Sequence, residues 1–113
     1  MTSTQLPNYL RTHRKRLVLS QDEVAFLLGA QGESKVSRYE RFGRKPSLEN
    51  ALAFEMIYQR SASELFSGLY QKVEAEVAAR AKALADQLAR GKPNRHTAHK
   101  RQILLNIANK SLN

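Results

Sequence analysis

The stretch from Leu19 to Glu40 reads LSQDEVAFLLGAQGESKVSRYE, and it predicts two short helices joined by a turn. Ser20, with Glu23 three residues later, forms a capping box, in which the serine accepts a backbone N–H and the glutamate reaches back. Gly29 suits the position just after a helix, where the left-handed conformation costs a glycine little. A second helix follows the turn and is predicted over Ser34–Arg41.

Helical patterns also lie on both sides of this pair. Pro7 suits a helix start, and Tyr9–Leu17 predicts a first helix with a strongly basic outer face. Pro46-Ser47 stops the chain and caps a fourth helix. The apolar stripe of that fourth helix is predicted to comprise Leu48, Ala51, Leu52 and Tyr58, and Ser61 or Ser63 then starts a further turn with Leu65 and Phe66. No strand alternation appears, so the predicted fold class is all-α.

The composition changes after Gly68. A helical stripe with a mean spacing near 3.8 residues runs through Leu69, Val73, Val77, Ala81, Leu84 and Leu88. Gly91-Lys92-Pro93 breaks this helix, and a basic terminal helix with Ile103, Leu104 and Ile107 on one side follows. We therefore predict two parts, residues 1–66 and a helical extension over 67–113.

The net charge of +9 over 113 residues favours a polyanionic partner, nucleic acid before membrane. Positive charge is concentrated in residues 1–20, 33–46 and 91–113, whereas 47–66 are acidic. The chain has no cysteine and no apolar run of membrane-spanning length, so we expect a cytoplasmic, nucleoid-associated protein. No pair of catalytic carboxylates and no metal-ligand set stands out, so neither an enzyme nor a cofactor is expected.

Two short helices with a glycine-containing turn, the second of them basic, describe a helix-turn-helix. The sequence resembles the lambda-repressor-like, Cro-type helix-turn-helix family, also called the xenobiotic-response-element family, from about Leu10 to Phe66. The residues that carry the resemblance are Ser20-Gln21, Val24-Ala25, Leu28-Gly29, Val36-Ser37, Tyr39-Glu40, Pro46 and Leu65-Phe66. The resemblance implies a five-helix DNA-binding domain followed by the helical extension.

The resemblance also implies which residues contact double-stranded DNA. The third helix would enter the major groove and bring Glu33, Ser34, Lys35 and Arg38 near base edges. Gln21 would contact a backbone phosphate, as would Ser37, Arg41, Arg44 and Lys45. Tyr39 is interpreted as a core residue rather than a base-stacking platform, and His13 as a solvated or phosphate-facing residue.

Glu40 lies among the basic residues from Lys35 to Lys45, and the family has a structural role for the glutamate at this position. The resemblance implies that Glu40 pairs with Arg14 of the first helix and so fixes the third helix. Val18 replaces the glycine that is common at the end of the first helix in the family.

Phe26 and Leu27 stand where the family is usually polar, on the outside of the second helix. Two exposed large apolar side chains need a cover. The hypothesis is that the helix containing Leu69, Val73 and Val77 packs on them, in the same chain or from a partner.

The expected function is a sequence-specific transcriptional regulator, a homodimeric repressor on a palindromic operator. The alternative is an antitoxin-like interaction module whose segment 67–113 binds a partner protein while the domain regulates its own promoter. In that case residues 91–113 would order only on binding. A third possibility is non-specific nucleic-acid binding. No small-molecule effector is predicted.

Overall fold

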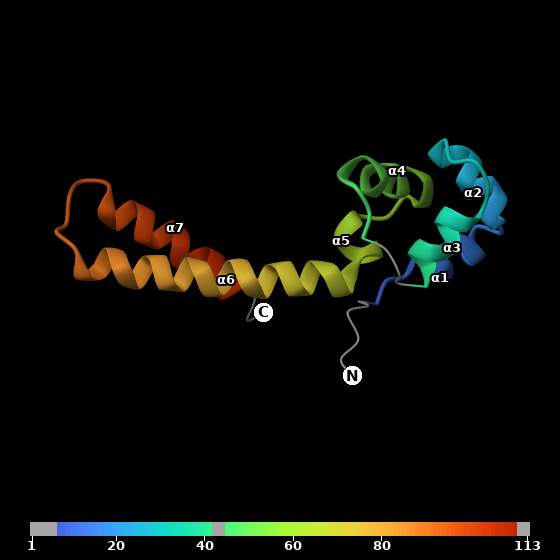
Figure 1. Cartoon of the computed structure of the whole chain (residues 1–113). Helices are drawn as coiled ribbons and strands as arrows, with labels where there is room; N and C mark the ends of the chain where they lie inside the picture. The colour runs from blue at the N-terminus through green and yellow to red at the C-terminus, as the bar shows by residue number, and fades with distance from the viewer. Residues whose placement is uncertain (1–6, 42–44, 111–113) are drawn as a thin grey trace. The chain divides into compact units, whose positions relative to one another are not determined.

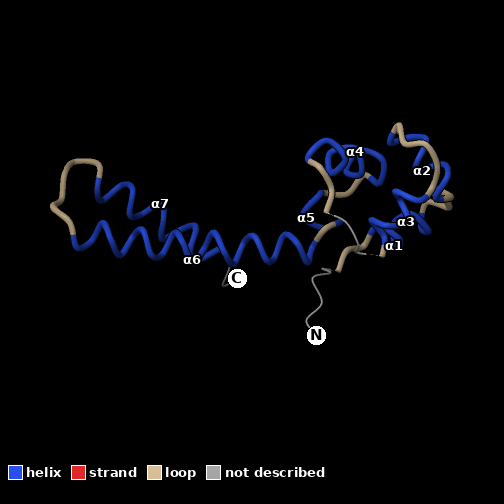
Figure 2. Tube along the Cα trace, in the orientation of Figure 1, coloured by secondary structure: helices blue, strands red, loops and turns tan. Residues whose placement is uncertain are grey.

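The computed structural model describes residues 7–41 and 45–110, and within them it contains only helices and no strand (Figures 1 and 2). The all-α prediction is therefore confirmed for the described residues. In chain order the helices are α1 (Leu10–Arg16), α2 (Gln21–Leu28), α3 (Ser34–Glu40), α4 (Leu48–Tyr58), α5 (Ala62–Leu65), α6 (Ser67–Arg90) and α7 (Thr97–Lys110).

The chain divides into two compact units, Met1–Tyr70 and Gln71–Asn113. The boundary lies inside α6, a few residues beyond the predicted one at residue 66. Leu69, in the first turn of α6, packs against the core of the first unit, and this packing explains the later boundary. Each unit is described below by itself.

Side-chain caps begin α2, α4 and α5, as the sequence predicts. The Ser20 hydroxyl accepts the Glu23 N–H at 3.0 Å, and the Glu23 carboxylate accepts the Ser20 N–H at 2.8 Å, so both halves of the capping box are present. Gly29 ends α2 in the left-handed conformation at φ 76°. Of the two serines proposed to start the fifth helix, Ser61 is the cap, since its side chain accepts the Glu64 N–H.

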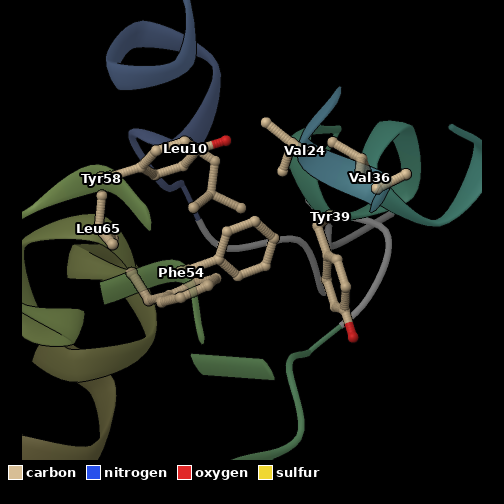
Figure 3. Packing of buried hydrophobic residues seen from close by; sticks show 9 residues of the cluster. Leu10, Val24, Val36, Tyr39, Phe54, Tyr58 and Leu65 are labelled. Carbon is tan, nitrogen blue, oxygen red and sulfur yellow. The ribbon is translucent and has the colours of Figure 1, made fainter. Parts of the chain in front are cut away.

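The core of the first unit is built around Phe54 (Figure 3). Its ring lies 5.5 Å from that of Tyr39 in a perpendicular arrangement, 5.7 Å from Tyr58 and 5.8 Å from Phe66. Perpendicular and offset aromatic pairs at these distances contribute beyond the area that they bury. The cluster therefore joins α3, α4 and the end of α5 through one side chain.

The predicted inner stripe of α4 is partly wrong. Leu48 and Leu52 are 76% and 54% exposed, whereas Phe54 and Tyr58 are buried. Apolar residues lie on every side of this helix, so the sequence pattern does not determine which side faces inward. The large ring of Phe54 faces the core instead.

Glu55 is the acidic residue of α4 that lies nearest the start of α5. Its Oε2 accepts the backbone N–H of Ala62 at 3.0 Å, and Ala62 is the first residue of α5. The first N–H groups of a helix have no partner within the helix. Glu55 therefore supplies an acceptor for α5, alongside the Ser61 cap.

The end of α1 carries backbone strain at Val18. This residue has φ 61°, in the left-handed region, and its side chain is almost fully exposed. A β-branched residue is a genuine outlier in that conformation. A glycine would adopt it freely.

We predict that Val18→Gly stabilises the protein by about 1 kcal/mol, because relief of the left-handed strain exceeds the entropic cost of glycine. Chemical denaturation measures the change. Leu17→Gly is the matched control: Leu17 is right-handed at φ −86°, so the same substitution there is expected to destabilise. Equal effects at the two positions would contradict the assignment of strain to Val18.

Candidate nucleic-acid interface

Glu40, at the end of α3, accepts hydrogen bonds from two other helices. The Arg14 Nε donates to its Oε2 at 2.6 Å and the Arg14 Nη2 to its Oε1 at 3.2 Å, which makes a two-pronged ion pair. The Gln21 Nε2, in the first turn of α2, donates to the same Oε1 at 3.1 Å. One carboxylate thus ties together α1, α2 and α3.

The predicted pair of Arg14 and Glu40 is therefore present, and it is shielded from water. The side chains are only 11% and 3% exposed. The hydrogen bonds from Arg14 to Glu40 raise the pKa of Arg14, against the opposing effect of its burial. The Arg14 Nη1 donates to the backbone carbonyl of Leu19 at 3.0 Å, so the guanidinium also holds the turn between α1 and α2.

Glu40 stands at the floor of a concave surface of about 490 Å³. The lining residues come from α1, from the cap and first turn of α2, and from α3 and its flanks: Arg11, Arg14, Lys15, Ser20, Gln21, Glu33, Ser37, Glu40 and Arg41. We call this surface the basic hollow. Arg14 neutralises Glu40, and three exposed cations, Arg11, Lys15 and Arg41, then face a single exposed acid, Glu33.

The outward face of α3 is polar and its inward face is packed. Val36, Tyr39 and Glu40 are buried. Of the predicted contact residues, those on the open side of the helix or beside it are Ser34, Ser37, Arg38 and Arg41, with Ser37 half-buried and the others exposed. The structure therefore separates a buried side of α3 from an accessible one, and the DNA contacts of the accessible residues stay a prediction.

The remaining predicted contact residues that the structure describes do not lie on this open side of α3. Lys35 is half-buried on the flank of α3, Glu33 precedes its first turn, and Lys45 is exposed beyond its end. Arg44 lies outside the described residues. Gln21 lines the basic hollow, but its amide also holds Glu40, a second role that sequence reasoning missed.

Tyr39 is a core residue, as predicted. Its ring is almost fully buried, its hydroxyl accepts the Asn50 Nδ2–H at 2.9 Å, and its backbone carbonyl accepts the Asn8 Nδ2–H at 2.8 Å. A ring held in this way is not available to stack on a base. Tyr39 therefore helps to fix the orientation of α3.

The interpretation of His13 is wrong. Its side chain is buried, and Nε2 lies 3.3 Å from the Glu64 carboxylate of α5. The exposed cations that α1 contributes to the basic hollow are Arg11 and Lys15. The sequence predicted a basic outer face on the first helix, but it did not show which of its basic residues face α3.

Phe26 and Leu27 are 82% and 54% exposed, so the proposed cover within the same chain is absent from the structure of the first unit. Leu69 packs on the core cluster instead, and Val73 and Val77 are about half exposed. Leu69 packs there because α6 begins at Ser67, so the first turn of α6 lies against Phe66 and the residues around it. Cover from a partner stays a prediction.

Tyr58 carries a buried hydroxyl that has no hydrogen-bond partner among the described residues. Burial raises the pKa of this phenol well above its ordinary range, the negative charge of Glu40 adds to the rise, and Arg14 opposes it. A buried polar group without a partner costs free energy relative to the same group in water.

Comparison of the chain with protein-family models, curated proteins and solved structures finds no match. Among the helices of the described residues, none combines the length and hydropathy needed to cross a membrane. In the same residues, no cluster of three or more His, Cys, Asp or Glu side chains is arranged to hold a metal ion.

Removal of the Glu40 carboxylate is expected to destabilise the first unit strongly. We predict that Glu40→Ala lowers the free energy of unfolding by about 3–5 kcal/mol, because it leaves the Arg14 charge buried without its partner. Asp86→Ala is the matched control, since Asp86 pairs with Lys82 on an exposed helix face at 3.1 Å. An exposed pair of that kind contributes less than about 1 kcal/mol. Similar losses from the two substitutions would contradict a central role for Glu40.

Removal of the Tyr58 hydroxyl is expected to stabilise. We predict that Tyr58→Phe gains about 1 kcal/mol at neutral pH, because it deletes a buried donor without a partner. The raised pKa makes the folded state hold the phenol proton more tightly than the unfolded state does. The wild type therefore loses stability as the pH rises above about 10, where the unfolded phenol ionises. Denaturant titrations at neutral and alkaline pH check both points, and an advantage of Tyr58→Phe that does not grow with pH would contradict the second.

Proposed function

We propose that the first unit binds double-stranded DNA sequence-specifically, with α2 and α3 acting as a helix-turn-helix. The proposal rests on one observation, which is that two surfaces of the first unit lie next to each other. The outward face of α3 offers polar and cationic side chains, and it adjoins the basic hollow, whose acid Glu40 is paired. A DNA-reading helix needs such a polar face beside backbone contacts that set its register.

The basic hollow is suited to the phosphate backbone. Arg11, Lys15 and Arg41 are exposed and come from both α1 and the end of α3, so they surround a concave surface. Ser20 and Gln21, at the start of α2, line the same surface and add polar groups to it. Contacts of this kind position a protein on DNA without reading its sequence.

Arg38 is the residue that we assign to base recognition. It is exposed on the outward face of α3, one turn beyond Ser34. An arginine can donate two hydrogen bonds to guanine O6 and N7 in the major groove, and a good pair of this kind discriminates by about 1–3 kcal/mol. Ser34 and Lys35 would contact neighbouring bases, with Glu33 at the entrance.

The biological role that we propose is that of a transcriptional regulator, a repressor that acts as a homodimer on a palindromic operator. Two-fold proteins of this type bind half-sites about one DNA turn apart. Occupancy of the operator would then exclude polymerase from the promoter.

An antitoxin-like interaction module is the second candidate. The half-exposed aliphatic side chains of α6 and α7 favour it, because they offer an apolar surface to another protein. That hypothesis expected residues 91–113 to order only on binding, whereas α7 is a helix over Thr97–Lys110 in the isolated chain. We therefore rank DNA regulation first.

Selection of bound sequences from random duplexes, followed by binding titrations, tests the proposal. We predict that Arg38→Ala relaxes the preference at one base position, by about 1–3 kcal/mol. Lys15→Ala should weaken binding to all duplexes equally and lower the salt slope by about one. Lys82→Ala removes the same charge from an exposed pair in the second unit, and it is expected to change neither property.

Binding of wild type is expected to fall by about 10³–10⁵-fold between roughly 50 and 200 mM salt if a dimer contacts six to ten phosphates. An equal affinity for selected and random duplexes would contradict sequence-specific recognition. A flat salt dependence would contradict the role of the basic hollow.

A further inference from the structure

The second unit is a hairpin of the α6 segment from Gln71 onward and α7, which run side by side in opposite directions (Figure 1). The side chains buried in it are small: Ala78, Ala81, Ala85 and Thr97. Arg101 links the two helices through a 3.4 Å hydrogen bond from its Nε to the Ala85 carbonyl. The backbones of the two helices do not approach closely along their length, and the buried side chains are small, so the hairpin buries little apolar area of its own.

The larger apolar side chains of the hairpin remain open to solvent. The relative exposure of the residue is between 37% and 46% at Val73, Val77, Leu84, Ile103 and Ile107. On α6 the intervals from Val73 to Val77, Leu84 and Leu88 are four, seven and four residues, which keep these residues on one side of the helix. They form a continuous stripe along α6, beside the line of buried alanines.

The apolar stripe of α6 and the apolar residues of α7 meet at one hollow. It has a volume of about 250 Å³ and is lined by Leu84, Leu88, Ile103, Leu104 and Lys100. The two helices therefore expose their aliphatic side chains on the same side of the hairpin, with a depression between them. We call this side the aliphatic face, defined by Val77, Leu84, Leu88, Ile103, Leu104 and Ile107.

We propose that the aliphatic face of a second copy of this chain covers this face, so that two hairpins form a four-helix bundle. Aliphatic residues on two helices, with a hollow between the helices, provide both ridges and grooves on one surface. Such a surface can pair with itself about a two-fold axis, each copy placing its ridge in the hollow of the other.

One side of the whole hairpin, of which the aliphatic face is a part, has the size that a stable dimer needs. The α6 part is about 30 Å long and α7 about 21 Å, and each helix is about 10 Å across. Their combined face covers roughly 500 Å² in projection, and side chains add to that area. Standard protein interfaces bury about 800 Å² of accessible surface per partner.

Most charges of the hairpin lie outside the hollow of the aliphatic face. Residues 71–110 carry nine lysines and arginines and three acids, so the hairpin is strongly basic. Lys100 is nevertheless the one charged residue that lines the hollow in the described structure. An acidic partner would be drawn to the cations outside the aliphatic face, whereas the face itself offers apolar contact.

This inference does not depend on the proposed DNA binding, because it concerns the free protein. Dimerisation by the aliphatic face removes apolar surface from water and brings like charges closer. Salt screens that repulsion, so the dimer should hold or tighten as ionic strength rises. The proposed DNA binding has the opposite dependence, so the two interactions can fail independently.

The test is sedimentation equilibrium of the full chain without nucleic acid. We expect a dimer at protein concentrations of about 10–100 μM, at salt from roughly 50 to 500 mM. The double variant Leu84→Gln with Ile103→Gln should weaken dimerisation by at least about 100-fold, with helicity checked by circular dichroism. Ala79→Gln is the matched control, since Ala79 is exposed on α6 and does not line the hollow, and it should leave the dimer unchanged.

Phe26→Ser distinguishes the aliphatic face from the other exposed apolar surface. This substitution should not alter the molar mass measured by sedimentation equilibrium, because Phe26 lies on α2 of the first unit. A wild-type monomer at about 100 μM would overturn the proposal. So would a dimer that Phe26→Ser dissociates and the double variant does not, or a double variant that stays helical and fully dimeric.

Discussion

The first unit depends on one buried carboxylate. Glu40 accepts three hydrogen bonds, two from Arg14 on α1 and one from Gln21 on α2, while it belongs to α3. A charge in a low-dielectric environment is tolerated only when its partners are in place, so any movement of one helix relative to the others leaves an ion unpaired. Apolar packing around Phe54 brings the helices together, and the directional bonds to Glu40 then select one arrangement of them.

The same pair determines the electrostatics of the surface above it. An unpaired glutamate among the cations of α1 and α3 would repel phosphate. Because Arg14 neutralises Glu40, the exposed charges of the basic hollow are Arg11, Lys15 and Arg41 against Glu33 alone. The structural pair and the proposed phosphate contacts therefore use different cations, and the stability of the unit does not compete with anion binding.

Local chemistry could be predicted from the sequence, and the orientation of helices within the core could not. The Ser20–Glu23 capping box and the left-handed Gly29 follow from short-range rules that need few neighbours. The Arg14 pair followed only from the family resemblance. The inward side of α4 and the burial of His13 were wrong, because α4 is apolar all round and His13 lies on a basic helix. Which residues are buried depends on neighbours from distant parts of the chain: Phe66 packs against Phe54 of α4, and Glu64 pairs with His13.

The two units solve the problem of a strongly basic chain in different ways. In the first unit a compact aromatic core stabilises the helices, and exposed cations gather on one surface, the basic hollow, where we propose that DNA binds. In the second unit the buried residues are mainly alanines, and the leucine and isoleucine side chains remain partly exposed. Helix pairs with so little buried area are marginal on their own. A structure of this kind reaches full burial only when its open face is covered. The +9 of each chain opposes the proposed association, and salt screens that repulsion because most of the charges lie outside the face and in solvent.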